Sequence, residues 1–332
     1  MRALALASLL FAGGVAAGCH WLVGTEDRSV GSLDAATLDA ATPAASSAPD
    51  DASPRDAAPD GDASPLACDP SKPFDSPVPV AGVNTVGGEF GVTLSLDELE
   101  IFFTSTGPSG GPSAVFRATR SSIGERFEGR IKVELDGLPV AAWGITLRPD
   151  GKELLVSAGA RPRRVYRAFR PAPGEPFGPA ELAPFLGSAA GVAFDTPAFG
   201  GEGILYLSRE QGPQFDMFFG FRDDAGATSS PKSLVAFNTS GTSEDWPIES
   251  LDGTTLFFSS GGLSATEIVE ARRGSRTEPY PIGRTLAFPQ SAFKHPGFVS
   301  KDGCRLYLVM ENAPGGGGGS DVFVASRGRT SQ

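Results

Sequence analysis

The chain has 332 residues, of which 43 are glycine and 28 are proline, and its formal net charge is −11. Short apolar runs alternate with glycine- and proline-containing turns, and long helical patterns are absent, so the sequence predicts an all-β protein. No basic face of the kind that binds a phosphate backbone is present, which argues against a nucleic-acid partner.

The first residues predict an export signal. After a positively charged start, residues 3–17 form an apolar run that is too short to span a bilayer comfortably. The run ends in AAGC at residues 16–19, which resembles the bacterial lipobox. That resemblance implies removal of residues 1–18 and lipidation of Cys19, and His20 in place of aspartate favours the outer membrane. The alternative is an ordinary secreted protein in which Cys19 has no such role.

Residues 19–67 predict a disordered tether. Residues 20–67 carry nine acidic and two basic side chains, and residues 34–65 have almost no aromatic or branched apolar ones. Such a segment cannot bury enough apolar surface to offset the entropy lost on ordering. Its expected role is to hold the folded body, residues 68–332, away from the membrane.

One β-hairpin pattern occurs five times in the body. The clearest copy is WPIESLDGTTLFFSS at residues 246–260, where Asp followed by Gly is a strong turn signal between apolar strands. The five turn acids are Asp97, Asp150, Glu202, Asp252 and Asp302, at spacings of 53, 52, 50 and 50 residues. A repeat of this length is typical of a β-propeller with one blade per repeat. We expect five blades, with six as the alternative if an outer strand is misassigned.

The order of the strands predicts how the ring closes. Residues 73–85 resemble the outermost strand of the other repeats, whereas the last repeat has only three strands of its own. The N-terminal strand is therefore expected to complete the last blade, which removes exposed sheet edges. This closure places Cys68 and Cys304 in the same blade, and in an exported protein they are predicted to form a disulfide. Two separate buried thiols are the alternative.

The repeats resemble those of TolB-like, Pro-Asp-Gly type, WD-like β-propellers. The nearest copies are RPDG at residues 148–151 and SKDG at residues 300–303, and the resemblance spans about residues 73–327. The third repeat departs from the pattern, with GGEG at residues 200–203. The resemblance implies a β-propeller that serves as a scaffold for protein partners or glycans, and fold alone does not assign a function.

The candidate site residues come from one position of the repeat. Seven residues before each turn acid, at the start of the innermost strand, lie Phe90, Trp143, Asp195, Asp245 and His295. Equivalent positions ring one mouth of a propeller channel, so acids and an imidazole are expected to face two aromatic side chains, with Glu89 and Glu244 nearby. Such a ring is suited to a cation, a sugar or a cationic peptide side chain. Two carboxylates there are also the groups that glycoside hydrolysis requires.

Three interpretations of this ring stay open: a structural ring bonded to neighbouring blades, a binding site, and a catalytic site. No catalytic serine motif, CxxC pair or HExxH motif is present, so neither a cofactor nor a Cys/His metal site is expected. The basic cluster at residues 161–170 is interpreted as a solvated loop and strand edge. The leading interpretation is a non-catalytic envelope lipoprotein that binds a protein or a glycan, and a glycan-active enzyme is the alternative.

Overall fold

The computed structural model describes residues 68–328, except residues 70, 186–192, 224, 263 and 290. The predicted signal peptide (residues 1–18), the lipidated Cys19 and the tether (residues 19–67) lie outside the described residues. Within the described part, no helix combines the length and the hydropathy that crossing a membrane requires.

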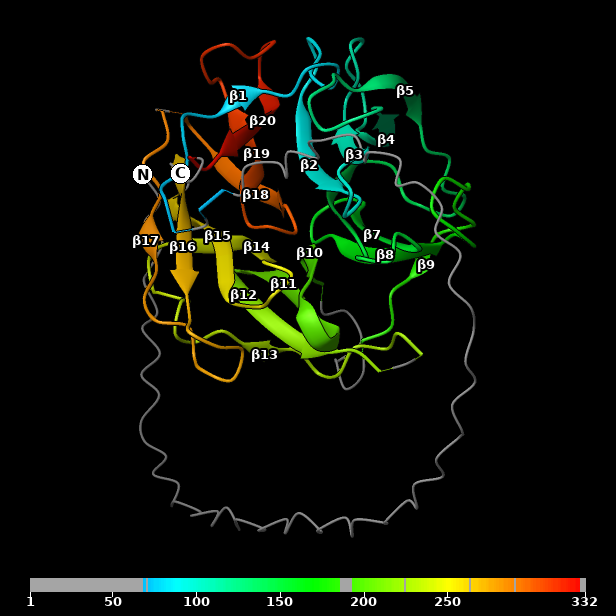
Figure 1. Ribbon diagram of the computed structural model, residues 1–332. Helices are drawn as coiled ribbons and strands as arrows, with labels where there is room; N and C mark the ends of the chain where they lie inside the picture. Colours follow the sequence, from blue (N-terminus) through cyan, green and yellow to red (C-terminus); the bar gives the residue numbers. More distant parts are fainter. Residues whose placement is uncertain are drawn as a thin grey trace, which may run out of the picture. The chain divides into compact units, whose positions relative to one another are not determined.

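The described residues form five four-stranded antiparallel sheets arranged as the blades of a propeller (Figure 1). Each blade runs from an innermost to an outermost strand. The first two blades are β2 (Glu89–Leu94), β3 (Glu100–Ser105), β4 (Ala114–Thr119) and β5 (Glu128–Lys132), and β6 (Ala142–Leu147), β7 (Glu153–Ala158), β8 (Arg164–Phe169) and β9 (Glu181–Leu182). The third is β10 (Asp195–Phe199), β11 (Ile204–Gln211), β12 (Gln214–Phe221) and β13 (Lys232–Ser233).

The fourth blade is β14 (Ser243–Glu249), β15 (Thr255–Gly262), β16 (Ala265–Arg272) and β17 (Arg284–Thr285). The fifth is β18 (Lys294–Val299), β19 (Arg305–Glu311), β20 (Ser320–Ser326) and the N-terminal strand β1 (Val78–Pro79). The five-bladed count predicted from the repeat is confirmed.

The predicted ring closure is confirmed. Val78 of β1 pairs with Val324 of β20 in an antiparallel register, and a further bridge joins Phe74 to Arg327. Cys68 and Cys304 are joined as a disulfide, with their Cα atoms 6.0 Å apart, within the usual range. The first and last parts of the folded body are therefore held in one blade by both backbone pairing and a covalent link.

The acidic turns form as their composition predicts. In the fourth blade, the Asp252 carboxylate accepts a 3.0 Å hydrogen bond from the Thr254 N–H, and Gly253 takes φ = 68°, a value that suits glycine. In the third repeat, the GGEG sequence instead forms a short 3-10 turn, Gly201–Gly203. The middle of each blade is apolar and buried; its central residues include Phe102, Leu154, Tyr206, Phe257 and Tyr307.

An arginine directly follows the third strand of every blade. The five are Arg120, Arg170, Arg222, Arg273 and Arg327. Arg170 donates from Nε to the Gly151 carbonyl oxygen at 2.6 Å and pairs with Glu100 of the preceding blade at 2.6 Å. Arg222 pairs in the same way with Glu153 at 2.7 Å. Arg170, Arg222 and Arg327 therefore reach a buried carboxylate of the preceding blade, whereas Arg120 and Arg273 pair with Glu98 and Glu249 of their own blades.

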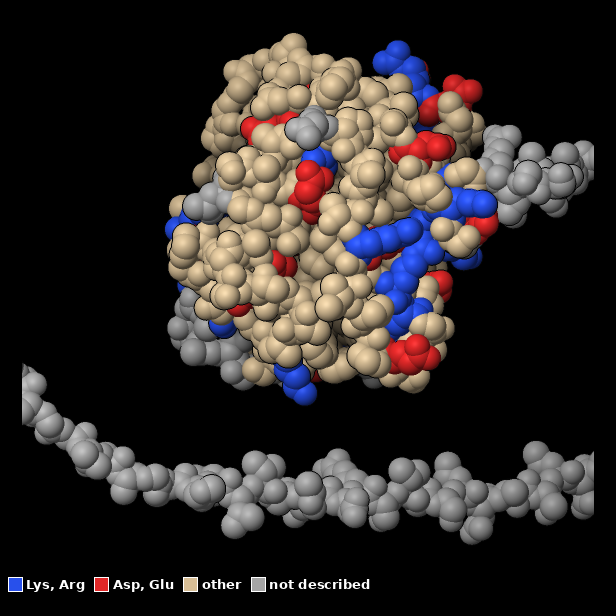
Figure 2. Space-filling model, turned by 90° about the vertical axis from the view of Figure 1, so that its left-hand side faces the viewer, with Lys and Arg blue, Asp and Glu red and all other residues tan. Residues whose placement is uncertain are grey.

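Lysine and arginine side chains gather in a stripe on one side of the molecule (Figure 2). β16 and β17 lie at this side in Figure 1 and carry Arg272 and Arg284, which both pair with Glu270 at 2.7 Å. Arg327 of the fifth blade reaches the same carboxylate at 2.5 Å. Some of the arginines on this side therefore form ion pairs with Glu270, and the pair made by Arg327 links the fourth and fifth blades.

Candidate functional site

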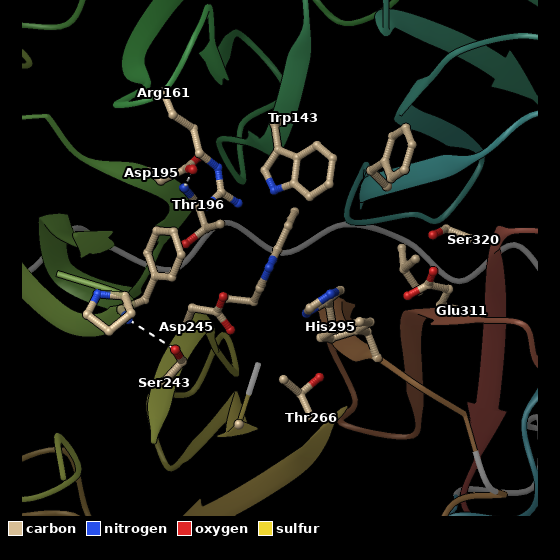
Figure 3. A pocket seen from close by; sticks show the side chains of 17 residues that line it. Trp143, Arg161, Asp195, Thr196, Ser243, Asp245, Thr266, His295, Glu311 and Ser320 are labelled. Carbon is tan, nitrogen blue, oxygen red and sulfur yellow. Dashed lines mark hydrogen bonds between the residues drawn. The ribbon is translucent and has the colours of Figure 1, made fainter. Parts of the chain in front are cut away.

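The innermost strands bring all five predicted positions to one cavity of about 410 Å³ (Figure 3). Phe90 lies on β2, Trp143 on β6, Asp195 on β10, Asp245 on β14 and His295 on β18. The register of each innermost strand shifts at or within two residues of its position. A β-bulge of this kind commonly re-aims a side chain near a functional site.

Aromatic rings form a continuous part of the cavity wall. The rings of Phe90 and Trp143 are stacked, with centroids 4.7 Å apart and planes inclined by 22°. Trp246 lies 6.3 Å from Trp143 and 5.0 Å from the His295 ring, between centroids. Phe90 and Trp143 are only half-buried, so part of their surface faces the cavity. This wall offers flat apolar faces to a ligand.

The backbone is unusual where two cavity residues sit. Thr196 has φ = 39° and Trp246 has φ = 53°, a region that is rare for residues other than glycine and costly for bulky side chains. Each follows one of the two predicted acids and lies in the bulge of its strand. Strained conformations of this kind concentrate at binding and catalytic sites.

Asp195 is held by its neighbours. One carboxylate oxygen pairs with Arg163 at 3.0 Å, and the other accepts a 2.9 Å hydrogen bond from the Thr196 N–H. The Arg163 guanidinium also lies 4.5 Å from the centroid of the Trp143 ring, a cation–π arrangement. Asp195 therefore fixes the geometry of the aromatic wall through Arg163, and its charge is balanced.

Asp245 is in the opposite situation. Its Oδ1 atom is buried and has no hydrogen-bond partner in the described part of the chain. The pKa of Asp245 is raised to about 8, mainly by burial and further by the nearby carboxylates of Asp195 and Glu244, whereas the positive charge of Arg161 lowers it. The group is therefore mostly protonated at neutral pH, and it lines the cavity with one buried oxygen left unpartnered.

His295 is neutral at physiological pH, because burial lowers its pKa to about 3. The Ser259 hydroxyl donates a 2.8 Å hydrogen bond to the Lys294 carbonyl oxygen and lies 3.1 Å from Nδ1 of His295. With the hydroxyl proton directed at that carbonyl, Nδ1 is the donor to Ser259, which leaves Nε2 as an acceptor. The imidazole then presents an aromatic face and one hydrogen-bond acceptor.

Glu89 and Glu244 do not line this cavity, so the expected acid-rich mouth is smaller than predicted. Both are buried and bonded to nearby loops. Glu89 accepts hydrogen bonds from Ser105 and from the hydroxyl and N–H groups of Thr85, and Glu244 accepts a 3.0 Å bond from the Thr239 hydroxyl. Their role is to hold the loops that precede β2 and β14.

Several cavity residues were not predicted from the sequence; they are Arg161, Phe215, Trp246, Phe293 and Glu311. Trp246 directly follows the predicted Asp245, so a search that also took the next residue of each innermost strand would have included it. The others come from the loops and strand ends above the channel, where the repeats differ in length. No group of three or more His, Cys, Asp or Glu residues suited to a metal ion occurs among the described residues.

No protein-family model matches the chain, and no curated protein sequence matches it. A thermostable family-43 glycoside hydrolase is similar in structure, with a TM-score of 0.52 and 14% identity over 76% of this chain and 92% of that chain. A putative glycoside hydrolase from Parabacteroides distasonis has a TM-score of 0.47 and 14% identity, over 79% of this chain and 94% of that chain.

A putative TolB from Agrobacterium tumefaciens gives a TM-score of 0.43 and 14% identity, over 72% of this chain and 83% of that chain. At these identities the likeness concerns the fold and assigns no activity. The chain is an all-β, five-bladed β-propeller with distant structural similarity to glycoside hydrolase and TolB propellers.

Proposed function

We propose that this protein is a non-catalytic binding protein of the bacterial cell envelope, whose propeller holds a glycan in the channel-mouth cavity. One observation carries the proposal: a cavity of about 410 Å³ combines stacked aromatic faces with a half-buried carboxyl group, Asp245, whose buried Oδ1 has no partner among the described residues. A structural ring would be expected to satisfy such a group, because an unpartnered buried polar atom costs about 1–3 kcal/mol.

The chemistry of the cavity suits a sugar. Pyranose rings present C–H faces, which pack on aromatic rings, and a rim of hydroxyl groups, which need hydrogen-bond partners. Phe90 and Trp143 supply the flat faces. Asp245 and Nε2 of His295 supply hydrogen-bond partners around them. A largely apolar pocket with a few placed polar groups is the usual design of a ligand site.

Binding is favoured over catalysis because glycoside hydrolysis needs two carboxyl groups that act on the same bond. Asp195, the natural partner of Asp245, is already engaged by Arg163 and by the Thr196 N–H. The second candidate function is nevertheless a glycosidase, and Asp245 is the observation that favours it. A carboxyl group that keeps its proton at neutral pH, with a pKa of about 8, is what a general acid requires.

The location belongs to the same proposal. Residues 1–18 would direct export, Cys19 would carry the lipid and residues 19–67 would tether the propeller to the outer membrane. The disulfide between Cys68 and Cys304 supports an oxidising compartment. Palmitate labelling of cells that express the wild type and Cys19→Ala tests the anchor. Labelling of the wild type alone is expected, and labelling of neither would contradict lipidation.

Calorimetry of the full-length chain against a panel of oligosaccharides tests the function. The wild type is expected to bind at least one glycan. The double variant Asp195→Ala/Asp245→Ala is expected to lose that binding. Phe221→Ala, which changes an exposed aromatic residue on β12 away from the cavity, is the matched control and should bind normally. Release of shorter sugars by the wild type, but not by Asp245→Asn, would favour the enzyme. Absence of glycan binding would direct the search to protein partners.

A further inference from the structure

The basic cluster at residues 161–170 is solvated only in part: Arg161 and Arg164 are exposed, as predicted, and the other three arginines are paired. Arg163 pairs with Asp195 at 3.0 Å, Arg167 with Glu181 at 2.7 Å, and Arg170 is buried against Glu100. Each of these three arginines thus has a defined acidic partner. The remaining question is what Arg161, at the start of the cluster, contributes.

Arg161 lines the cavity without an acidic partner. Its side chain extends from the loop between β7 and β8, and its guanidinium lies 5.4 Å from the centroid of the Phe215 ring on β12. In the described part of the chain, no ion pair or hydrogen bond holds this guanidinium. Figure 3 shows it on the same side of the cavity as Asp195 and Thr196. It is exposed, so a ligand in the cavity can reach it.

The other charges of the cavity do not balance Arg161 locally. Arg163 already compensates the carboxylate of Asp195. Glu311 is the remaining carboxylate of the lining, with no ion-pair partner among the described residues, and Figure 3 places it on the opposite side of the cavity, beside Ser320. The cavity is therefore polarised, with the positive charge of Arg161 on the Asp195 side and the negative charge of Glu311 on the opposite side.

We propose that the ligand is an anionic glycan and that Arg161 binds its charged group, the carboxylate of a uronic acid or a sulfate ester, at the Asp195 side of the cavity. This inference rests on the proposed glycan binding. A guanidinium fork matches the planar geometry of a carboxylate and forms two parallel, charge-assisted hydrogen bonds. The aromatic wall would then hold the ring of the same sugar, and the stacking of Arg161 on Phe215 would orient the fork.

The state of Asp245 supports this orientation. A protonated carboxyl that lines the same cavity as Arg161 can donate a hydrogen bond to an incoming anion, whereas an ionised one would repel it. Because its pKa is about 8, binding of an anionic sugar is expected to weaken as the pH rises from 7 to 9. In Asp245→Asn, which stays uncharged, this pH dependence should disappear.

The test compares glycans that differ in charge alone. Full-length protein is titrated with tetrasaccharides of galacturonate, glucuronate and mannuronate, with their methyl esters, and with a sulfated and an unsulfated galactan of equal length. We expect at least one acidic member to bind about tenfold or more tightly than its neutral counterpart, in line with a charged hydrogen bond. Arg161→Gln should remove that preference, and Arg161→Lys should recover only part of it. Arg164→Gln, an exposed change outside the cavity lining, is the control.

Each outcome separates the two proposals. A preference for the uronates over the sulfated galactan, or the reverse, identifies the anionic group. Equal binding of acids and esters, binding of neutral glycans alone, or an unchanged preference in Arg161→Gln would overturn the role of Arg161 while leaving glycan binding in place. Absence of binding to every glycan would overturn both.

Discussion

Asp245→Asn is predicted to make the propeller more stable at neutral and alkaline pH. The carboxyl has an unpartnered buried oxygen, and its pKa is raised from 3.8 to about 8. Between these pH values the folded chain keeps a proton that the unfolded chain has released. The free energy of unfolding therefore falls as the pH rises from about 4 to about 8, and the loss is complete above that range.

The magnitude follows from the same values. Each unit of pKa corresponds to roughly 1.4 kcal/mol, so a shift of about four units gives an upper limit of about 6 kcal/mol above pH 8. Asp245 is only half-buried in an open cavity, and solvent screens the charge, so we expect about 1–3 kcal/mol. For a domain of this size that gain raises Tm by about 2–4 °C per kcal/mol.

Urea unfolding of the wild type and Asp245→Asn at pH 4, 6, 8 and 9 measures this effect. The two proteins should be almost equally stable at pH 4, and the variant should gain stability up to pH 8. Asp195→Asn is the control, because it leaves the Arg163 guanidinium without its 3.0 Å partner and should destabilise at neutral pH. If Asp245→Asn destabilised the chain, or its effect were independent of pH, Asp245 would be a bonded structural residue and the reasoning would fail.

Three further predictions concern the frame around the cavity. Arg170→Met should lower the free energy of unfolding by about 3–5 kcal/mol, because Glu100 would lose a partner at 2.6 Å, whereas Lys132→Met at an exposed pair should change it by less than about 1 kcal/mol. Thermal unfolding compares the two, and similar losses would contradict an inter-blade role. Cys304→Ser should cost about 2–5 kcal/mol in urea unfolding, and a reductant should then have no further effect; an unchanged midpoint would mean that the disulfide does not form. In the wild type, the folded imidazole of His295 stays neutral down to its pKa of about 3, while the unfolded one takes up a proton below pH 6.5, so the free energy of unfolding falls over that range. His295→Gln should reduce this fall, and an equal fall in both proteins would refute the reasoning.

The repeat made much of the fold predictable. Acidic turns at 50- to 53-residue spacing fixed the blade count, and the missing outer strand of the last repeat pointed to β1 as the closing strand. The five inner-strand positions also follow from the repeat, because equivalent positions of a propeller converge on its axis. These features depend on backbone periodicity, which a single sequence displays directly.

The parts that could not be predicted depend on the directions of individual side chains and on partners across blades. Glu89 and Glu244 looked like cavity acids from their positions, but both are hydrogen-bonded to the loops that precede their own strands. Arg170 lay in an apparently solvated basic run, yet it is buried against Glu100 of another blade. Such pairings join residues about 70 positions apart at angles that no local pattern encodes. An arginine in the same place after each third strand was the available signal.

The most direct test of the central claim is a titration of tryptophan fluorescence with the oligosaccharide that binds most tightly. Trp143 and Trp246 both line the cavity, so their emission should change along a saturable curve with the calorimetric Kd. The change should shrink in Trp143→Phe, and Trp143→Ala should weaken binding by about tenfold or more, whereas Phe221→Ala should behave as the wild type. If the glycan bound tightly without changing the emission, and bound Trp143→Ala as tightly as the wild type, the ligand would lie elsewhere and the account of the cavity would be contradicted.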